Sequence, residues 1–315
     1  MSSTNSTSRF KGAPGTFYPK HLTYINFGEN AITMICEFVS MSLIIHLFYI
    51  TRFKKTRFKR MSPSLEIFLL SEMSMAFLTI FYRVYVVFNW RPPVLRSESN
   101  PMLYDMNVLF WTGILNNNFF ALASVPAVFL AIDRCLALNF IQHKIRQRIS
   151  VFGIVLLVLL YLGSSAYYLN DLPLDMEFAF WLQCEVFTCL TIRSASFLQH
   201  MVKMASGIIT VICGIYFFYV CGKSSHSKNI KNRMVKLVVI SELVLNVVPN
   251  CMKYFFNKVI GISITWYLGE YGVLLCAVEL TVHSVLYTRM FKGNWNPFAK
   301  PPTKVQSIRN ISRTT

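Results

Sequence analysis

Seven stretches of the chain consist mainly of apolar residues, and short polar segments separate them. An α-helix needs about 20 such residues to cross the hydrocarbon core of a bilayer. The pattern predicts helices over residues 31–50, 65–88, 107–132, 149–169, 203–221, 235–256 and 266–287. We therefore expect an all-α membrane protein whose fold is a bundle of seven transmembrane helices.

The composition supports this interpretation. Hydrophobic residues make up 54% of the chain and charged residues only 14%, whereas about 25% of residues are charged in soluble domains. The formal net charge of +17 would suggest nucleic acid in a soluble protein. Here the basic residues flank apolar stretches, so we expect them to meet the lipid bilayer and no nucleic acid. The sequence has no zinc-ligand spacing, nucleotide-binding loop or catalytic cluster, so we expect no metal, no cofactor and no enzyme activity.

The basic residues also predict which way the bundle faces. They concentrate in the loops 51–64, 133–148 and 222–236 and in the tail after residue 287. The positive-inside rule then places the N-terminus outside and the C-terminus in the cytoplasm. The domains would be an extracellular N-terminus over 1–30, a seven-span domain over 31–287 and a cytoplasmic tail over 288–315. Asn5 begins a glycosylation sequon on the expected outer side.

One apolar run, 178–192, leaves the number of spans open. It contains Glu185 and has acidic residues nearby, so we expect a structured outer loop, with an eighth span as the alternative. Cys184 and Cys189 lie in this run and either pair with each other or stay free.

The third predicted helix ends in Asp133-Arg134-Cys135. Charged groups are costly next to lipid, and this pair resembles the Asp-Arg-Tyr signature of heptahelical G-protein-coupled receptors. The resemblance implies that the acid holds the arginine in the inactive receptor and that the arginine meets the G protein in the active one. The alternative is that Arg134 is a basic anchor that extends to the membrane surface.

Other motif positions of that family match in part. Cys135 replaces the tyrosine of the signature, and Ile141 replaces a proline that usually follows it. Pro249 matches the kinking proline of the sixth helix, and Tyr287 matches the tyrosine near the end of the seventh. No lysine lies in the seventh predicted helix, which argues against a retinal-binding opsin.

Two stretches, FLAIDRCLAL (129–138) and KNRMVKLVVISELVLNVVP (231–249), resemble the nematode serpentine chemoreceptors, and the bc class best. The resemblance implies a small-molecule ligand, a heterotrimeric G protein as partner, and a plasma membrane that could be that of a sensory cilium. The residues expected to meet the G protein are Asp133, Arg134, Lys144, Arg146, Lys231, Arg233 and Tyr287. The alternative for the basic ones is attraction to anionic lipid.

Several polar residues interrupt the apolar helices, and such residues are candidates for function. Glu279, His283 and Tyr287 recur every four residues and so share one helix face. We expect a polar network that connects the two halves of the bundle, made of Glu72, Glu242, Pro249, Glu279 and His283. The alternative is interhelical hydrogen bonding, worth about 0.6 kcal/mol per contact. Arg83, near a helix end, is expected to extend to the membrane surface.

A ligand is expected between the outer halves of the helices, where bundles form their binding sites. The candidate contacts are polar or aromatic residues of these halves: Trp111, Asn116, Asn117, Asn118, Lys253, Trp266, Glu270 and Tyr271. Hydrogen-bonded packing is the alternative for the asparagines, and a position at the membrane interface is the alternative for the aromatic residues.

The favoured interpretation is therefore a chemosensory receptor that binds a small chemical cue and activates a G protein. Two other classes stay open. The acidic residues within the helices also suit a proton- or cation-coupled transporter. A ligand-gated channel of the insect odorant-receptor kind would have its N-terminus inside. A membrane-embedded enzyme ranks last.

Overall fold

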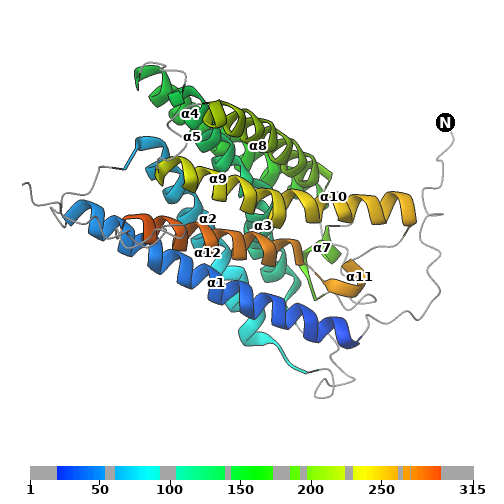
Figure 1. The fold of residues 1–315 in the computed structure, drawn as a ribbon. Helices are drawn as coiled ribbons and strands as arrows, with labels where there is room; N and C mark the ends of the chain where they lie inside the picture. Colours follow the sequence, from blue (N-terminus) through cyan, green and yellow to red (C-terminus); the bar gives the residue numbers. More distant parts are fainter. Residues whose placement is uncertain are drawn as a thin grey trace, which may run out of the picture.

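The computed structural model describes residues 20–53, 61–92, 104–138, 143–172, 185–191, 197–223, 230–261, 265–269 and 271–291. Within these ranges the regular structure is helical and no strand occurs (Figure 1). Seven helical stretches are long and apolar enough to cross a membrane. The predicted seven-helix, all-α fold is confirmed for this part of the chain, which is a multi-pass membrane protein.

The first, second, fourth, fifth and seventh spans are single helices: α1 (Lys20–Phe53), α2 (Pro63–Asn89), α5 (His143–Tyr168), α8 (Phe197–Lys223) and α12 (Tyr271–Phe291). The third span is α3 (Met106–Leu122) followed by α4 (Ser124–Leu138). The sixth is α9 (Ile230–Glu242), η5 (Leu243–Val247), α10 (Val248–Phe255) and η6 (Phe256–Ile260). Short helices outside the spans are η3 (Leu169–Asp171), α7 (Phe187–Leu190) and α11 (Thr265–Leu268). We call the end where α1, α4, α8 and α12 terminate the basic end.

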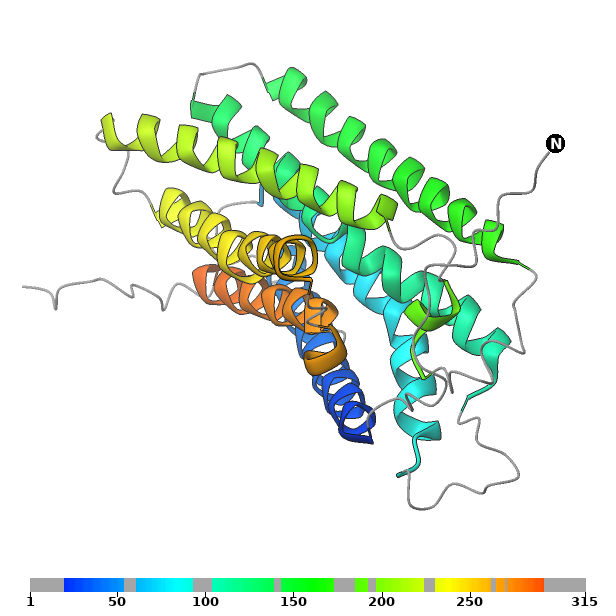
Figure 2. The same cartoon turned by 90° about the vertical axis from the view of Figure 1, so that its right-hand side faces the viewer.

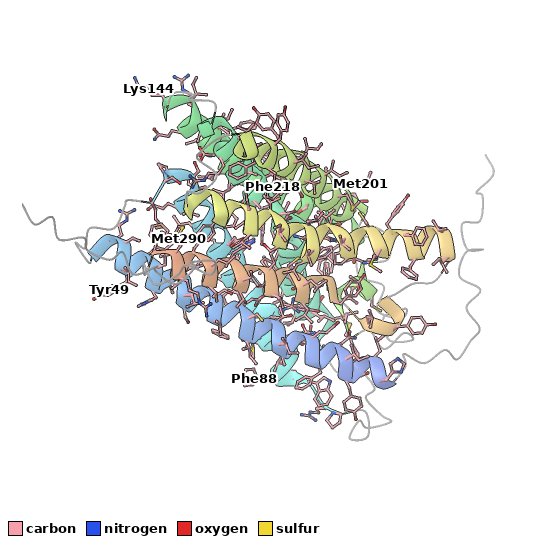
Figure 3. The ribbon with its side chains drawn as sticks, in the orientation of Figure 1. Tyr49, Phe88, Lys144, Met201, Phe218 and Met290 are labelled. Atoms are coloured by element: carbon pink, nitrogen blue, oxygen red, sulfur yellow. The ribbon has the colours of Figure 1, made fainter. Side chains whose placement is uncertain are left out.

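The third span lies at the centre of the bundle. In its most apolar stretch 72% of the residues are buried, against 17% in the fourth span. It contacts α2, α5 and α8, while α1 packs between α2 and α12. Figures 1 and 2 show α5 on the far side of the bundle from α1 and α12. Apolar side chains such as Tyr49, Phe88 and Met201 project away from the bundle, where lipid would surround them (Figure 3).

The first helix is longer than its apolar run. It begins at Lys20, not at residue 31, so the segment predicted as an extracellular N-terminus is partly helical. Polar residues in these added turns are buried rather than solvated: Asn26 and Asn30 are about 5% and 3% exposed. The amide of Asn30 donates to the carbonyl of Asn26 at 2.7 Å. Hydropathy misses these turns because it counts such side chains as polar whether or not they are paired inside the bundle.

Prolines explain the irregular third and sixth spans. Pro126 has no N–H for the carbonyl of Leu122, and the third span breaks at Ala123. In the sixth span the ring of Pro249 would clash with the carbonyl four residues earlier. The preceding turn widens into a π-helix, in which the N–H of Val248 donates to the carbonyl of Leu243, five residues back.

The seventh span and the run 178–192 also differ from a simple hydropathy reading. The predicted helix over 266–287 is interrupted at Gly269, whose φ of +70° ends α11, and the span itself starts at Tyr271. In the run 178–192 the structure describes 185–191, and its only helix there is the four-residue α7. This part is a loop that packs on the bundle: Phe187 contacts Phe110 and fills the space beside Gly113.

Candidate functional site

A cluster of buried polar side chains connects three spans, the second, sixth and seventh, near the middle of the bundle. Glu72, Glu279 and His283 are each 5% exposed or less. Nδ1 of His283 lies 3.3 Å from a carboxyl oxygen of Glu72, and Nε2 lies 2.9 Å from the hydroxyl of Ser241. The same Nε2 lies 3.8 Å from Glu279. The structure therefore brings together three of the residues that the sequence predicts as a polar network.

The hydrogen-bond pattern constrains the proton positions around His283. The Ser241 hydroxyl donates to the carbonyl of Val238 at 2.8 Å, so its oxygen is left to accept from Nε2–H. Nδ1 faces the carboxyl group of Glu72 on the opposite side of the ring. His283 thus links a residue of the second span to residues of the sixth and seventh.

Asn246 joins the other two acids to this cluster. It is 2% exposed, and its amide donates to Glu242 at 3.1 Å and to Glu279 at 2.8 Å. The widened turn at 243–247 contains Asn246, so the irregular backbone positions this side chain. Pro249 causes that turn and has no polar role of its own. All five predicted network residues therefore belong to one structural unit.

The predicted site did not include Lys203, a charged residue at the start of the fifth apolar stretch. Its ammonium is 3% exposed and donates to the carbonyl of Phe120 at 2.9 Å and to the thiol of Cys276 at 2.7 Å. It also lies 3.8 Å from the centroid of the Phe120 ring, a cation–π contact. No carboxylate of the described residues forms an ion pair with it.

Lys203 belongs to a polar stripe on the inward face of α8. The stripe runs along one helix face, three or four residues apart, and consists of Gln199, Lys203, Ser206 and Thr210, all buried. Ser206 bonds Ser124 of the third span at 2.6 Å. Neither amide atom of Gln199 has a hydrogen-bond partner within the described part of the chain. The spacing of three or four residues between these polar side chains was a signal in the sequence that the site prediction did not use.

A second polar cluster surrounds Arg83, and here the prediction of an arginine extending to the membrane surface is wrong. Arg83 is 2% exposed and donates to the side-chain oxygens of Asn30 and Asn116. Its Nε lies 3.9 Å from Glu37, which also accepts a hydrogen bond from Thr79 at 2.8 Å. Burial among polar partners on three spans makes extension to the surface unnecessary. Glu37, at the centre of the first apolar run, was also missed.

The three consecutive asparagines all face other helices. Asn116 binds Arg83, Asn117 donates to the hydroxyl of Tyr168, and Asn118 bonds Ser164 at 2.5 Å and Ser165 at 2.7 Å. Each amide thus has an interhelical partner. In the structure the three asparagines therefore fit the alternative of hydrogen-bonded packing between helices rather than ligand contact.

The remaining predicted ligand contacts do not converge on a cavity. Trp111 is 54% exposed and points away from the bundle, because it lies opposite the buried face of α3. Lys253 is half-buried on α10, a helix with no buried residue that projects beyond its neighbours (Figure 1). Tyr271 is half-buried at the start of α12. The side chain of Trp266 and all of Glu270 lie outside the described residues.

At the basic end, Arg134 is half-buried and donates to the hydroxyl of Ser62 at 2.8 Å. Ser62 is the N-cap of α2, and its hydroxyl makes no bond to the backbone of its own helix. Asp133 is fully buried, but Arg134 forms no ion pair with a carboxylate of the described residues. The resemblance implies that the neighbouring acid holds the arginine. In the structure a serine of the second span holds it instead.

The other predicted coupling residues are less well placed by the structure. Tyr287 is buried against the ring of Phe68, and Lys144 is exposed at the start of α5 (Figure 3). The side chains of Arg146, Lys231 and Arg233 lie outside the described residues, as does the sequon residue Asn5.

Cys189 is in a disulfide, and its partner is outside the described residues. A hollow between α2, α4 and α5, lined mainly by apolar residues with Ser64 and Ser150 at one side, contains none of the predicted ligand contacts. Among the described residues, no group of three His, Cys, Asp or Glu side chains is arranged to hold a metal ion.

Neither a scan against models of known protein families nor a search of curated protein sequences finds a match to this chain.

Proposed function

We propose that this protein is a receptor of the nematode serpentine chemoreceptor type, in the plasma membrane, that binds a small chemical cue and activates a heterotrimeric G protein. The observation that carries the proposal is the position of Arg134. It lies at the basic end of the central span, half-buried, and among the described residues it donates one hydrogen bond, to the uncharged hydroxyl of Ser62. A hydrogen bond from a charged group is worth about 1.5–3 kcal/mol, so a modest rearrangement releases the guanidinium.

The proposed orientation places the basic end in the cytoplasm, in accord with the positive-inside rule. A cue that binds better to one arrangement of the bundle would increase its population. The cluster of Glu72, Asn246, Glu279 and His283 connects the second, sixth and seventh spans, so it is well placed to couple their movements. An epitope at each terminus of the protein in intact cells tests the orientation, since an N-terminus inside would favour the channel.

Arg134→Ala tests the coupling. We expect it to lower nucleotide exchange on purified heterotrimeric G proteins by at least about tenfold, equal to about 1.4 kcal/mol, for receptor in lipid nanodiscs with a panel of small organic compounds. Arg148→Ala is the matched control, because Arg148 is an exposed arginine at the same end of the bundle, on α5. The proposal fails if compounds bind to the receptor but none promotes exchange on any G protein tested.

In this proposal Gln199 and Lys203 are added to the candidate ligand contacts. A buried amide without partners costs about 1–3 kcal/mol, and a ligand that hydrogen-bonds to it would recover that free energy. We expect Gln199→Leu to raise the melting temperature of the ligand-free protein, because it removes the unpaired amide, and to weaken the response to a cue by about tenfold. Thr112→Val is the control, since Thr112 already donates to its own helix at 2.6 Å. A loss of stability in Gln199→Leu would contradict this role.

A proton- or cation-coupled transporter is the second candidate. The observation that favours it is the buried contact of His283 with Glu72 at 3.3 Å, with Glu279 3.8 Å from the same ring. Glu279→Gln in proteoliposomes separates the two candidates: a transporter would lose its pH-driven substrate flux, whereas a receptor shows no flux in either form.

A further inference from the structure

Two cysteines from different spans meet near the basic end of the bundle. Cys135 follows Arg134 in the third span, and Cys213 lies on α8 in the fifth. The sulfur of Cys135 donates to the backbone carbonyl of Cys213 at 3.4 Å, and the side chain of Cys213 packs against the apolar cluster that contains Cys135. Neither cysteine is in a disulfide. The position that holds a tyrosine in the Asp-Arg-Tyr signature thus contributes one thiol of a closely spaced pair.

The surroundings hold this pair in place. Cys135 is 8% exposed and packs with Phe217 and Val239, while Cys213 is half-buried at the edge of the same cluster. Gly214 lets α8 approach α9 closely, because a Cβ there would lie 2.4 Å from the side chain of Val239. Phe218, labelled in Figure 3, lies between these two helices. The two cysteines are therefore fixed by packing on both sides.

We propose that Cys135 and Cys213 are a reversible thiol–disulfide pair that a small neutral peroxide oxidises. Cys213, the more exposed thiol, would react first: its sulfur bonds to one oxygen of hydrogen peroxide, the O–O bond breaks, and water leaves to give a sulfenic acid. The sulfur of Cys135 then displaces the hydroxyl group as a second water. In total two thiols and one peroxide give one disulfide and two waters, and a dithiol such as dithiothreitol reverses the reaction.

Other free cysteines of the described residues lack this arrangement. Cys276 is buried beside Lys203 and Asn246, Cys251 is exposed on α10, and Cys36 is on α1. None of the three has a hydrogen bond to a second cysteine within the described part of the chain. A disulfide between Cys135 and Cys213 would fix the third span to the fifth one residue from Arg134. Its effect on G-protein coupling rests on the proposed function, but formation of the bond does not.

The test uses the full-length protein in lipid nanodiscs, treated with increasing hydrogen peroxide and then with a thiol-blocking reagent. Mass spectrometry of the non-reduced digest should detect a peptide that links Cys135 to Cys213, and dithiothreitol should remove it. We expect the link to form at least about tenfold faster than in protein unfolded by detergent, because the fold keeps the thiols in contact.

Cys135→Ser and Cys213→Ser should each abolish the linked peptide, whereas Cys251→Ser and Cys221→Ser should leave its yield unchanged. Three results would overturn the proposal. They are oxidation of Cys213 to a sulfinic acid without the link, a link from Cys135 to Cys221, and equal rates in folded and unfolded protein. A failure of G-protein coupling would overturn the proposed function and leave these outcomes unaffected.

Discussion

Replacing Arg83 with methionine is expected to destabilise the folded bundle by about 3–5 kcal/mol, the usual result of leaving a buried charge without its partner. The guanidinium supports three side chains from two other spans: Glu37, Asn30 and Asn116. Methionine keeps much of the volume but donates no hydrogen bond. The free energy of unfolding can be measured by titrating protein in mixed micelles with a denaturing detergent.

A second substitution shows which part of this loss comes from Glu37. In Arg83→Met combined with Glu37→Met neither charge is left in the cluster, and we expect most of the lost stability to return. Arg52→Met is the matched control, because Arg52 pairs with Glu66 on the surface, where such pairs contribute about 0–1 kcal/mol. If the double variant were as unstable as Arg83→Met, the ion pair with Glu37 would not be the reason for the burial of Arg83.

Asn246→Leu is expected to cost about 2–4 kcal/mol. Its amide donates to both Glu242 and Glu279, so the substitution leaves two buried carboxyl groups each without a donor. An unsatisfied buried acceptor costs about 1–3 kcal/mol, which exceeds the average hydrogen bond between membrane helices of about 0.6 kcal/mol. The same detergent titration measures the effect.

Asn250→Leu is the control for this substitution. Asn250 lies one turn further along the sixth span, and its amide donates only to the carbonyl of Asn246, on its own helix, at 2.7 Å. We expect a loss below about 1 kcal/mol for this variant. Equal losses for the two asparagines would mean that the contacts of Asn246 across the bundle contribute no special stability.

The number and type of the spans could be predicted from the sequence because they depend on length and apolar content alone. The fourth span shows this well: the prediction over 149–169 agrees closely with the apolar part of α5, Gln147–Tyr168, although the helix itself begins at His143. Helix ends were less accurate where polar residues are buried. The turns before residue 31 contain Asn26 and Asn30, which are polar and yet buried inside the bundle, so they look like loop residues in a hydropathy pattern.

The candidate site was predicted in part for a related reason. Glu279 and His283 share a helix face by their spacing alone, so their proximity follows from one helix. The contacts of Lys203 and Arg83 follow instead from which helices are neighbours, and no local pattern gives that. Trp111 illustrates the opposite error, since an aromatic residue near asparagines looked like a ligand contact but faces away from the bundle.

The widened turns of the sixth span have a consequence for sequence alignment. Each π-helical turn at 243–247 and 256–260 contains one residue more than an α-helical turn. Every position beyond such a turn is therefore rotated by about 100° relative to a regular helix. Suppose that this span is aligned without a gap to a straight helix of another protein. If the two helices match on one side of Pro249, then on its other side inward-facing positions of one protein are paired with lipid-facing positions of the other. In chimeras that exchange part of this span, both junctions should therefore lie on the same side of the two widened turns.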